Sequence, residues 1–331
     1  MAPPFNGLAL IKSKVTMKKI VILIPVFNEE KSVVDNLTEI LKQARAQHKV
    51  SIHLLLVDDG SGDNTVACLR PLCEVDNDVH LLCLNRNFGK EAAIHAGLNR
   101  INRADAVIVM DSDLQHPPSL IPKMIDLWID EGFDVIEACK KSRGKEPFTK
   151  KLLVRLYYAF FELASGLQMN NQSDFKLLDK KVVDAYCDLP EVDRFFRGLV
   201  NWMHFETAQI YFDVPVTHER ESSWSRWRLA KYAVLSITSF TSSPLQIVTF
   251  LGIVTLFLSA VIGAMTFYQK LSGQAIDGFT TVILLILFIG SILMLSLGLI
   301  GVYVAKIYNG IKNRPAYLVN YEQSHIKEDE L

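Results

Sequence analysis

Two long apolar runs near the C-terminal end constrain this chain more than any other feature. Residues 245–269 and 279–305 contain no charged side chain and are rich in Leu, Ile, Val and Phe. Each run exceeds the roughly 20 residues that a helix needs to cross about 30 Å of hydrocarbon. Buried core helices seldom run that far without a charge, so the sequence predicts two membrane-spanning helices. Only nine residues separate them, which predicts a hairpin with both ends on one side of a membrane.

The charges around the two runs predict the orientation of this hairpin. Lysines and arginines cluster before the first run and after the second, whereas the connecting loop holds one lysine and one aspartate. By the positive-inside rule, both flanking regions are expected on the cytoplasmic side. The five cysteines are odd in number and form no CxxC pair. They are therefore expected to be reduced thiols, which suits a cytoplasmic domain.

Composition separates the chain into a membrane part and a soluble part. All charged residues lie outside the two apolar runs, so the mean hydropathy of +0.19 averages two different environments. With 50% hydrophobic and 21% charged residues, the chain is neither disordered, nor collagen-like, nor a disulfide scaffold. A net charge of −1 argues against nucleic acid as a partner, because nucleic-acid-binding domains are usually strongly basic.

The part before the apolar runs has the pattern of an α/β domain. Short apolar runs at 20–25, 53–57, 80–84, 106–110 and 134–138 predict strands, and helical patterns fill the intervals at 30–46, 64–74, 90–102 and 119–131. This alternation predicts a mostly parallel sheet with helices on both faces. We expect a disordered extension at 1–16, a ligand-binding cytoplasmic domain at 17–222, a juxtamembrane interfacial helix at 223–243, the hairpin within 244–305 and a cytoplasmic tail at 306–331.

Polar residues gather where three of the predicted strands end. The segments 25–30 (PVFNEE), 58–61 (DDGS) and 111–113 (DSD) each follow a strand, and ligands of parallel sheets bind at those carboxyl ends. No GxGxxG motif follows the first strand, and no GxxxxGK[ST] motif occurs. A dinucleotide-dependent oxidoreductase and a P-loop NTPase are therefore poorly supported.

The DSD segment predicts a divalent metal site. Asp111 and Asp113 flank Ser112, so in an extended chain their side chains point the same way. Two carboxylates at a strand end suit Mg²⁺ or Mn²⁺, which bridges protein carboxylates and nucleotide phosphates. An isolated pair of this kind is more often a solvated turn or a helix cap. Here Asp59 ends a second strand, where it could accept hydrogen bonds from a base or a ribose.

Five segments together resemble family 2 glycosyltransferases: 25–30, 57–61, 85–91 (NRNFGKE), 96–98 (AGL) and 110–118 (MDSDLQHPP). With two terminal spans behind them, they look most like the polyisoprenyl-phosphate glycosyltransferases, which include bactoprenol glucosyltransferases and dolichol-phosphate mannose synthases. The likeness covers about residues 17–320. It implies a Rossmann-like, nucleotide-sugar-binding domain of the GT-A type, followed by a two-helix transmembrane hairpin.

The resemblance also implies roles for individual residues. Asp111 and Asp113 would hold Mg²⁺ or Mn²⁺. Asp174, in the segment SDFKLL, matches the Asp of the family's GDFRLM stretch, a candidate catalytic base. Because a lipid phosphate is already largely deprotonated at neutral pH, Asp174 could orient the acceptor instead. Nucleotide-sugar contacts are expected from Pro25, Val26, Asn28, Glu29, Asp59, Lys90, Asp111 and Gln115.

Basic residues after the last predicted strand suggest where a lipid acceptor binds. Lys141, Arg143 and Lys151 precede or begin an aromatic-rich amphipathic segment at about 148–165, as expected of an interfacial helix. A solvated basic face is the alternative for this segment. Arg197 falls where relatives carry basic residues, so these four are candidate lipid-phosphate contacts. Ser223 stands where many relatives have lysine, which leaves the sugar and the phosphate contacts open.

The implied activity is inverting transfer of a hexose, glucose favoured, from a nucleotide sugar, UDP favoured, to undecaprenyl phosphate. The protein would lie in the bacterial inner membrane, with its catalytic domain and both termini cytoplasmic, as a homo-oligomer serving lipopolysaccharide or other cell-envelope modification. One alternative is a processive polysaccharide synthase, but two spans make a poor channel and no QxxRW follows the DSD region. The other is a non-catalytic nucleotide-binding scaffold, which intact Asp59, Asp111, Asp113 and Asp174 oppose.

Overall fold

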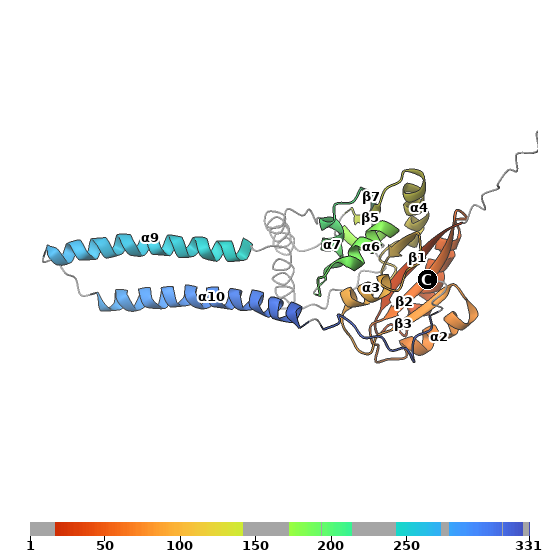
Figure 1. Ribbon diagram of the computed structural model, residues 1–331, viewed down its shortest axis with the longest axis horizontal. Helices are drawn as coiled ribbons and strands as arrows, with labels where there is room; N and C mark the ends of the chain where they lie inside the picture. Colours follow the sequence, from red (N-terminus) through yellow and green to blue (C-terminus); the bar gives the residue numbers. More distant parts are fainter. Residues whose placement is uncertain are drawn as a thin grey trace, which may run out of the picture.

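A seven-stranded sheet forms the centre of the domain (Figure 1). The computed structural model describes residues 17–141, 172–192, 194–213, 243–272, 278–312, 314–326 and 331. The strand order is β3-β2-β1-β4-β6-β5-β7. The strands are β1 (Lys18–Val26), β2 (Val50–Asp58), β3 (Val79–Cys83), β4 (Ala106–Val109), β5 (Val135–Lys140), β6 (Gln172–Asp179) and β7 (Thr207–Phe212). The five predicted strands and the mostly parallel sheet are confirmed.

Helices cover both faces of this sheet. On one face lie α1 (Val33–Arg45), α2 (Thr65–Val75) and α4 (Ile121–Asp130), the last preceded by the short 3-10 helix η1 (Pro118–Leu120). On the other face lie α3 (Lys90–Leu98), α6 (Lys180–Asp188) and α7 (Phe196–Trp202). From β1 the chain adds β2 and β3 on one side, and it then adds β4 on the other side of β1, so the order in which strands are added reverses between β1 and β4. In open α/β sheets a ligand binds beside such a reversal.

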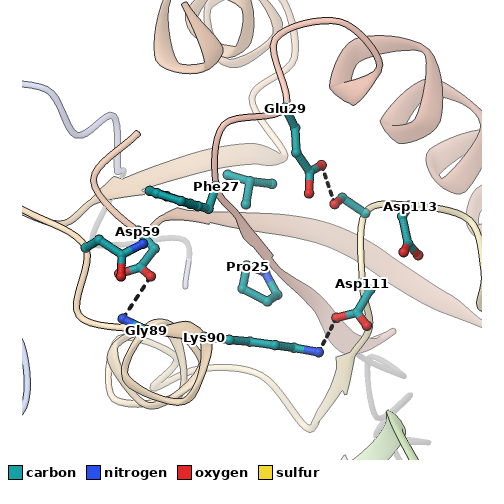
Figure 2. Close-up of a pocket in the computed structure, with 11 residues that line it drawn as sticks. Pro25, Phe27, Glu29, Asp59, Gly89, Lys90, Asp111 and Asp113 are labelled. Carbon is teal, nitrogen blue, oxygen red and sulfur yellow. Dashed lines mark hydrogen bonds and ion pairs between the residues drawn. The ribbon is translucent and has the colours of Figure 1, made fainter. Parts of the chain in front are cut away.

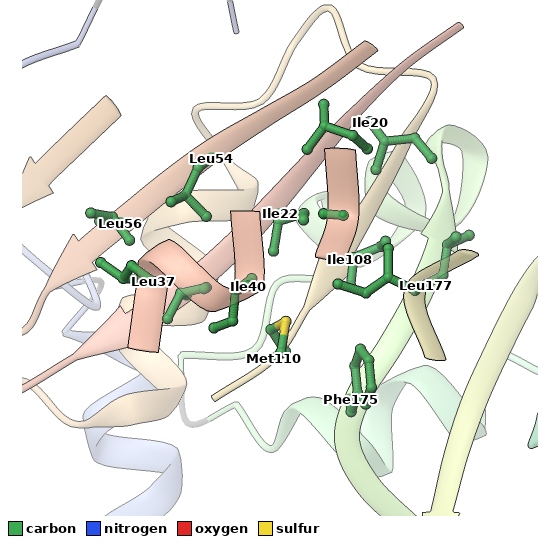
Figure 3. Packing of buried hydrophobic residues seen from close by; sticks show 14 of the residues in the cluster. Ile20, Ile22, Leu37, Ile40, Leu54, Leu56, Ile108, Met110, Phe175 and Leu177 are labelled. Atoms are coloured by element: carbon green, nitrogen blue, oxygen red, sulfur yellow. The ribbon is translucent and has the colours of Figure 1, made fainter. Parts of the chain in front are cut away.

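The sequence of β1 explains why this strand is central. Ile20, Ile22 and Ile24 belong to the core on the α1 side, whereas Val21 and Leu23 belong to the core on the α3 side. Successive side chains of a strand point to opposite faces, so a strand covered on both faces needs an unbroken apolar run. Figure 3 shows the first of these cores, where Leu37 and Ile40 of α1 pack over the strands.

Strand β6 is antiparallel to both of its neighbours, β4 and β5. Its pairing with β4 sets Lys176 opposite Val109. Continued by two residues, this register brings Asp174 to the level of Asp111, just beyond the carboxyl end of β4. The antiparallel strand therefore brings a carboxylate from its own beginning to the edge of the sheet where the parallel strands end.

Close packing of α3 on the sheet depends on Gly97. A Cβ atom at this position would lie 2.2 Å from Leu23 Cδ1 and 3.0 Å from Val57 Cγ2, and both neighbours are buried. Overpacking of a core costs about 1–3 kcal/mol, against a gain in helix propensity of about 1 kcal/mol for alanine. We expect Gly97→Ala to lower the free energy of unfolding by about 1–2 kcal/mol, measured by denaturant unfolding. Gly62→Ala is the control, because a Cβ there meets nothing within 4 Å, and equal losses in the two variants would contradict the prediction.

Two long apolar helices, α9 (Ser243–Leu271) and α10 (Phe279–Ile311), lie side by side and extend away from the sheet (Figure 1). Within them, Val248–Gln269 and Phe288–Ile311 are long and apolar enough to span a membrane. Large apolar side chains such as Leu256 and Leu295 are exposed along these helices. Exposed apolar surface of this extent is unfavourable in water, so the pair suggests association with a membrane. The two helices could form the predicted hairpin.

After α10 the chain returns to the sheet and covers its β3 edge (Figure 1). Antiparallel bridges join Leu81 to His325 and Leu84 to Val319. The backbone N–H of Asn85 donates to the carbonyl of Leu318 at 2.9 Å. Residues 314–326 therefore shield an edge strand whose backbone groups would otherwise be open to another chain. The sequence did not predict this return.

Candidate active site

A cavity of about 310 Å³ opens at the carboxyl ends of β1, β2 and β4 (Figure 2). Of the predicted site residues, it is lined by Pro25, Val26, Glu29, Asp59, Lys90, Asp111 and Asp113. Phe27, Asn87, Gly89 and Ser112 also line it, although the sequence did not single them out. These four sit inside the motifs already recognised, so their position next to the predicted residues was the available signal. The volume falls in the range of small-ligand sites.

Asn28 and Gln115 lie beside the cavity and are not among its lining residues. The backbone N–H of Asn28 donates to Ser61 Oγ, and its own Oδ1 accepts from the N–H of Gly62, both at 2.9 Å. Asn28 has a φ of 53°, a backbone conformation that asparagine tolerates better than most residues. Its contacts tie the loop after β1 to the loop after β2.

The carboxylate of Asp59 is buried and holds the loop that precedes α3. Its Oδ1 accepts from the N–H of Phe88 at 2.7 Å, and its Oδ2 accepts from the N–H of Gly89 at 2.9 Å. Burial raises the pKa of Asp59, while these two hydrogen bonds act in the opposite direction. Each carboxylate oxygen can accept more than one hydrogen bond. Asp59 therefore shapes the cavity wall and still has capacity to accept from a ligand.

A short hydrogen bond connects the loop after β1 to the DSD loop after β4. The hydroxyl of Ser112 donates to Glu29 Oε2 at 2.5 Å. Figure 2 marks this bond by the dashed line that starts at Glu29. The backbone N–H of Glu29 donates in turn to Thr65 Oγ1 at 2.8 Å, at the start of α2. Glu29 thus positions Ser112, and with it the two aspartates on either side.

His116 packs under the DSD loop, between Phe175 and the backbone of Asp111. Its buried ring stacks on Phe175 at 5.4 Å between centroids, and its Nδ1 lies 3.4 Å from the backbone N–H of Asp111. Burial lowers the pKa of His116, so the ring is neutral at neutral pH and Nδ1 can accept that hydrogen bond. His116 has a packing and hydrogen-bonding role here.

The donor set at the DSD loop fits a divalent cation. Asp111 and Asp113 both line the cavity, and Asp113 Oδ1 also accepts from the N–H of Gln115 at 3.1 Å. Among the residues that the structure describes, no group of three or more His, Cys, Asp or Glu side chains forms a metal site. Mg²⁺ is commonly bound by one or two carboxylates together with substrate phosphates and water. Two carboxylates that line a cavity in the size range of small-ligand sites match that arrangement.

Asp174 lies between two cations. Arg197 binds it through two nitrogens, Nε to Oδ1 at 2.7 Å and Nη2 to Oδ2 at 3.0 Å. Lys90 Nζ lies 2.6 Å from Asp174 Oδ2 and 2.5 Å from Asp111 Oδ1. Burial alone would raise the pKa of Asp174, but Lys90 and Arg197 outweigh it and hold this pKa well below its usual range. Lys90 therefore connects Asp174 to the DSD loop.

A second ion pair lies on the same face of β6. Lys176 and Glu137 are both buried and pair across β6 and β5. Burial lowers the pKa of Lys176, opposed by Glu137. Lys176 stands at the arginine position of the GDFRLM stretch, two residues after Asp174.

The other predicted lipid-phosphate contacts are placed only in part. Lys141 follows β5 at the same edge of the sheet. It is exposed, and its Nζ lies 3.4 Å from Asp213 Oδ2. Arg143 and Lys151 lie outside the described residues, as do the predicted interfacial helix at about 148–165 and residues 223–242. Of the two predicted contacts that the structure describes, Lys141 and Arg197, the second is bound to Asp174.

Comparison with known proteins gives consistent matches over most of the chain. Residues 21–186 match the family model described as Glycosyl transferase family 2. An uncharacterised glycosyltransferase of Synechocystis sp. is 34% identical, over 90% of this chain and 94% of the relative. The SfII prophage-derived bactoprenol glucosyl transferase of Shigella flexneri is 31% identical, over 93% of this chain and 98% of the relative. Among solved structures, glucosyl-3-phosphoglycerate synthase of Mycobacterium tuberculosis in complex with UDP is similar with a TM-score of 0.45 and 18% identity, over 67% of this chain and 79% of that one.

Proposed function

Because the chain belongs to glycosyl transferase family 2, we propose that it is a membrane-bound, inverting glycosyltransferase that glycosylates a polyisoprenyl phosphate. The donor is a nucleotide sugar, with UDP-glucose favoured, and the acceptor is undecaprenyl phosphate. One observation carries the proposal: Asp59, Asp111 and Asp113 line one cavity, and Lys90 in its wall also binds Asp174. The name of the Shigella relative supports glucose and bactoprenol as the substrates.

The nucleotide end of the donor is assigned to the cavity beside Asp59. Pro25, Val26 and Phe27 supply an apolar wall there, which suits the flat face of a base. Asp59 accepts hydrogen bonds from the base or the ribose with the lone pairs that Phe88 and Gly89 leave free. The diphosphate lies toward the DSD loop, where Asp111 and Asp113 would hold Mg²⁺ or Mn²⁺. Such a cation, when bound, stabilises the negative charge of the leaving nucleotide.

The acceptor phosphate is assigned to the side of Arg197 and Lys90. An oxygen of this phosphate attacks the anomeric carbon, the bond from that carbon to the nucleotide's phosphate oxygen breaks, and the single displacement inverts the anomeric centre. The acceptor phosphate is largely deprotonated at neutral pH, and the low pKa of Asp174 makes this carboxylate a weak base. Asp174 therefore serves to orient Arg197 and Lys90 toward the phosphate.

The two apolar helices support a position of the site at a membrane surface. We assign α9 and α10 as transmembrane helices of a multi-pass protein in a bacterial inner membrane. The basic flanks of these helices support a cytoplasmic position for the catalytic domain and both termini. There the enzyme meets its nucleotide sugar and the phosphate head of the lipid. Self-association of the protein is part of the same proposal, and light scattering in detergent would test it.

The proposal is tested by incubating the purified full-length protein with undecaprenyl phosphate and a panel of UDP- and GDP-sugars. Mass spectrometry is expected to detect a lipid carrying a single hexosyl phosphate, formed best from UDP-glucose. A polymeric product would instead indicate a processive synthase. Absence of both product and metal-dependent nucleotide-sugar binding in calorimetry would indicate a non-catalytic scaffold.

Removal of divalent metal is expected to stop transfer. Chelation with EDTA should lower the initial rate at least about 100-fold, because the leaving diphosphate loses its stabilising charge. Addition of excess Mg²⁺ or Mn²⁺ should restore the rate, whereas Ca²⁺, which prefers six to eight oxygen ligands at longer distances, should restore less of it. An unchanged rate in EDTA would show that Asp111 and Asp113 work without a metal.

A further inference from the structure

Glu91 joins the two helices that carry the cations around Asp174. It follows Lys90 in the first turn of α3, and its Oε2 accepts a hydrogen bond of 2.7 Å from the backbone N–H of Phe196. Phe196 begins α7 and directly precedes Arg197. A single carboxylate therefore connects the start of α3, which bears Lys90, to the start of α7, which bears Arg197.

The surroundings of Phe196 make this connection well defined. The Phe196 side chain is buried, and its ring contacts Tyr186 of α6 edge to face, at 5.7 Å between centroids. On the other side of the hydrogen bond, α3 packs against β1 and β2 through its buried residues 93–98. Glu91 thus fixes a short helix to a firmly packed one, which leaves Arg197 little freedom to move away from Asp174.

We propose that Glu91 is a positioning residue for sugar transfer, which holds Arg197 against Asp174 by anchoring the first residue of α7. The inference rests on the proposed function, in which Arg197 and Lys90 receive the acceptor phosphate. Without the anchor, Arg197 keeps its charge but loses its fixed distance to Lys90. The acceptor phosphate then binds less tightly and in a less productive position, while the nucleotide at Asp59 is unaffected.

The ionisation of Glu91 adds a pH dependence to this role. Among the described residues, four charged or titratable groups face it: Lys90 on its own helix, Asp174 of β6, Arg197 of α7 and Tyr186 of α6. Burial and then Asp174 raise the pKa of Glu91 to about 7, against the opposing effects of the Phe196 amide, Lys90 and Arg197. Below that pH the carboxyl is neutral and accepts an ordinary hydrogen bond. Above it, the ionised carboxylate accepts a stronger, charge-assisted one.

Two variants separate the hydrogen bond from the charge. Glu91→Ala removes the acceptor, and Glu91→Gln keeps an amide oxygen that can accept from Phe196 but carries no charge. Glu39→Ala is the matched control, because Glu39 is a half-buried residue of α1 that, among the described residues, pairs with Lys42 and Gln43. In Glu91→Ala we expect kcat/KM for undecaprenyl phosphate to fall about tenfold or more, with an unchanged Kd for UDP and Mn²⁺ in calorimetry; loss of one hydrogen bond to a charged group has about this effect.

The pH profile tests the charge. The ratio of kcat/KM for wild type to that for Glu91→Gln is expected near one at pH 6 and about fivefold higher at pH 8. Titration of the lipid phosphate affects both proteins equally and cancels in this ratio. A ratio that stays constant with pH would exclude a role for the charge of Glu91.

Hydrogen exchange gives a readout that does not depend on catalysis. Amides of residues 196–202 are expected to exchange at least about tenfold faster in Glu91→Ala than in Glu39→Ala, because α7 has lost its anchor. Unchanged exchange there, or wild-type kinetic constants in Glu91→Ala, would overturn the inference while transfer by the wild type stands. If the wild type itself transfers no sugar, the proposed function falls, and this inference falls with it.

Discussion

Replacement of Asp111 or Asp113 by asparagine is expected to lower the rate of sugar transfer at least about 10³-fold. Each variant removes one negative charge from the DSD loop and keeps the shape of the side chain. A bound divalent cation contributes several kcal/mol to stabilisation of a leaving diphosphate, and about 4 kcal/mol corresponds to this factor. The initial rate of lipid glycosylation by the purified protein, followed by mass spectrometry, measures the loss.

The two variants should also lose metal-dependent binding of the nucleotide sugar in calorimetry, although their folds remain intact. Asp126→Asn is the matched control, because Asp126 is an exposed residue of α4 that pairs with Lys49 far from the cavity. This control should keep the wild-type rate and affinity. Near-normal turnover in either DSD variant would show that the cation, or the reaction, lies elsewhere.

Asp111→Asn should differ from Asp113→Asn in its effect on Lys90. Lys90 Nζ lies between Asp111 and Asp174, so loss of the Asp111 charge leaves Asp174 as its remaining carboxylate partner in the described contacts. Among the residues that the structure describes, no Lys or Arg side chain pairs with Asp113, so its replacement leaves Lys90 undisturbed. The sensitivity of the rate to acceptor concentration should therefore change in Asp111→Asn and stay constant in Asp113→Asn.

Five strands could be predicted from the sequence because they are buried on both faces. A strand covered by helices on both sides is apolar along most of its length, as residues 20–24 of β1 are. Strand β6 breaks that pattern, since Asp174 and Lys176 interrupt its apolar residues. Both side chains are buried all the same, because Arg197 and Glu137 neutralise them. Those partners come from distant parts of the chain, and no local pattern reveals them.

The cavity could be predicted for a related reason. Motifs that follow parallel strands converge at one edge whatever the length of the intervening helices, so Asp59 and Asp111 were expected to meet. The contacts among them were not predictable, because they depend on side-chain geometry. Asn28 forms hydrogen bonds with the loop after β2. The Lys90 side chain forms ion pairs with Asp111 and Asp174 and does not point into open space.

The path of residues 314–326 along β3 also lay beyond prediction. Val319 and His325 pair with an edge strand, and such pairing depends on where α10 ends relative to the sheet. Because the segment that follows α10 forms backbone hydrogen bonds with the β3 edge, α10 is linked to the sheet by these bonds as well as by the chain itself. The apolar runs themselves predicted the helices and not this connection.

Asp174→Asn is expected to lower the transfer rate about 10²–10³-fold and to destabilise the protein. The variant leaves Lys90 and Arg197 facing each other without the carboxylate that separates their charges. Removal of one partner from a fully buried ion pair costs about 3–5 kcal/mol. Lys90 and Arg197 are partly exposed, so a loss of roughly 1–3 kcal/mol in the free energy of unfolding is expected here. Asp184→Asn is a suitable control, because Asp184 pairs with Lys180 on the exposed face of α6.

The pH dependence of transfer separates an orienting Asp174 from a catalytic base. Its pKa is depressed in the folded protein, so its charge contributes stability above the ordinary aspartate pKa, and that contribution is lost only as the pH falls through the depressed value. Between pH 5 and 9 neither stability nor rate should therefore show a step that belongs to Asp174. The rate should instead rise with ionisation of the acceptor phosphate, and Asp174→Asn should keep that rise at a lower overall rate.

An acceptor with a different pKa completes this test. If Asp174 only orients, a lipid phosphonate whose second pKa lies above that of the phosphate should shift the rise in rate by the same amount. If Asp174 removes a proton during attack, the rise belongs to the enzyme, stays in place with either acceptor, and disappears in Asp174→Asn. The close contacts of Arg197 and Lys90 with Asp174 favour the first outcome, since a carboxylate held by two cations has little affinity for a proton.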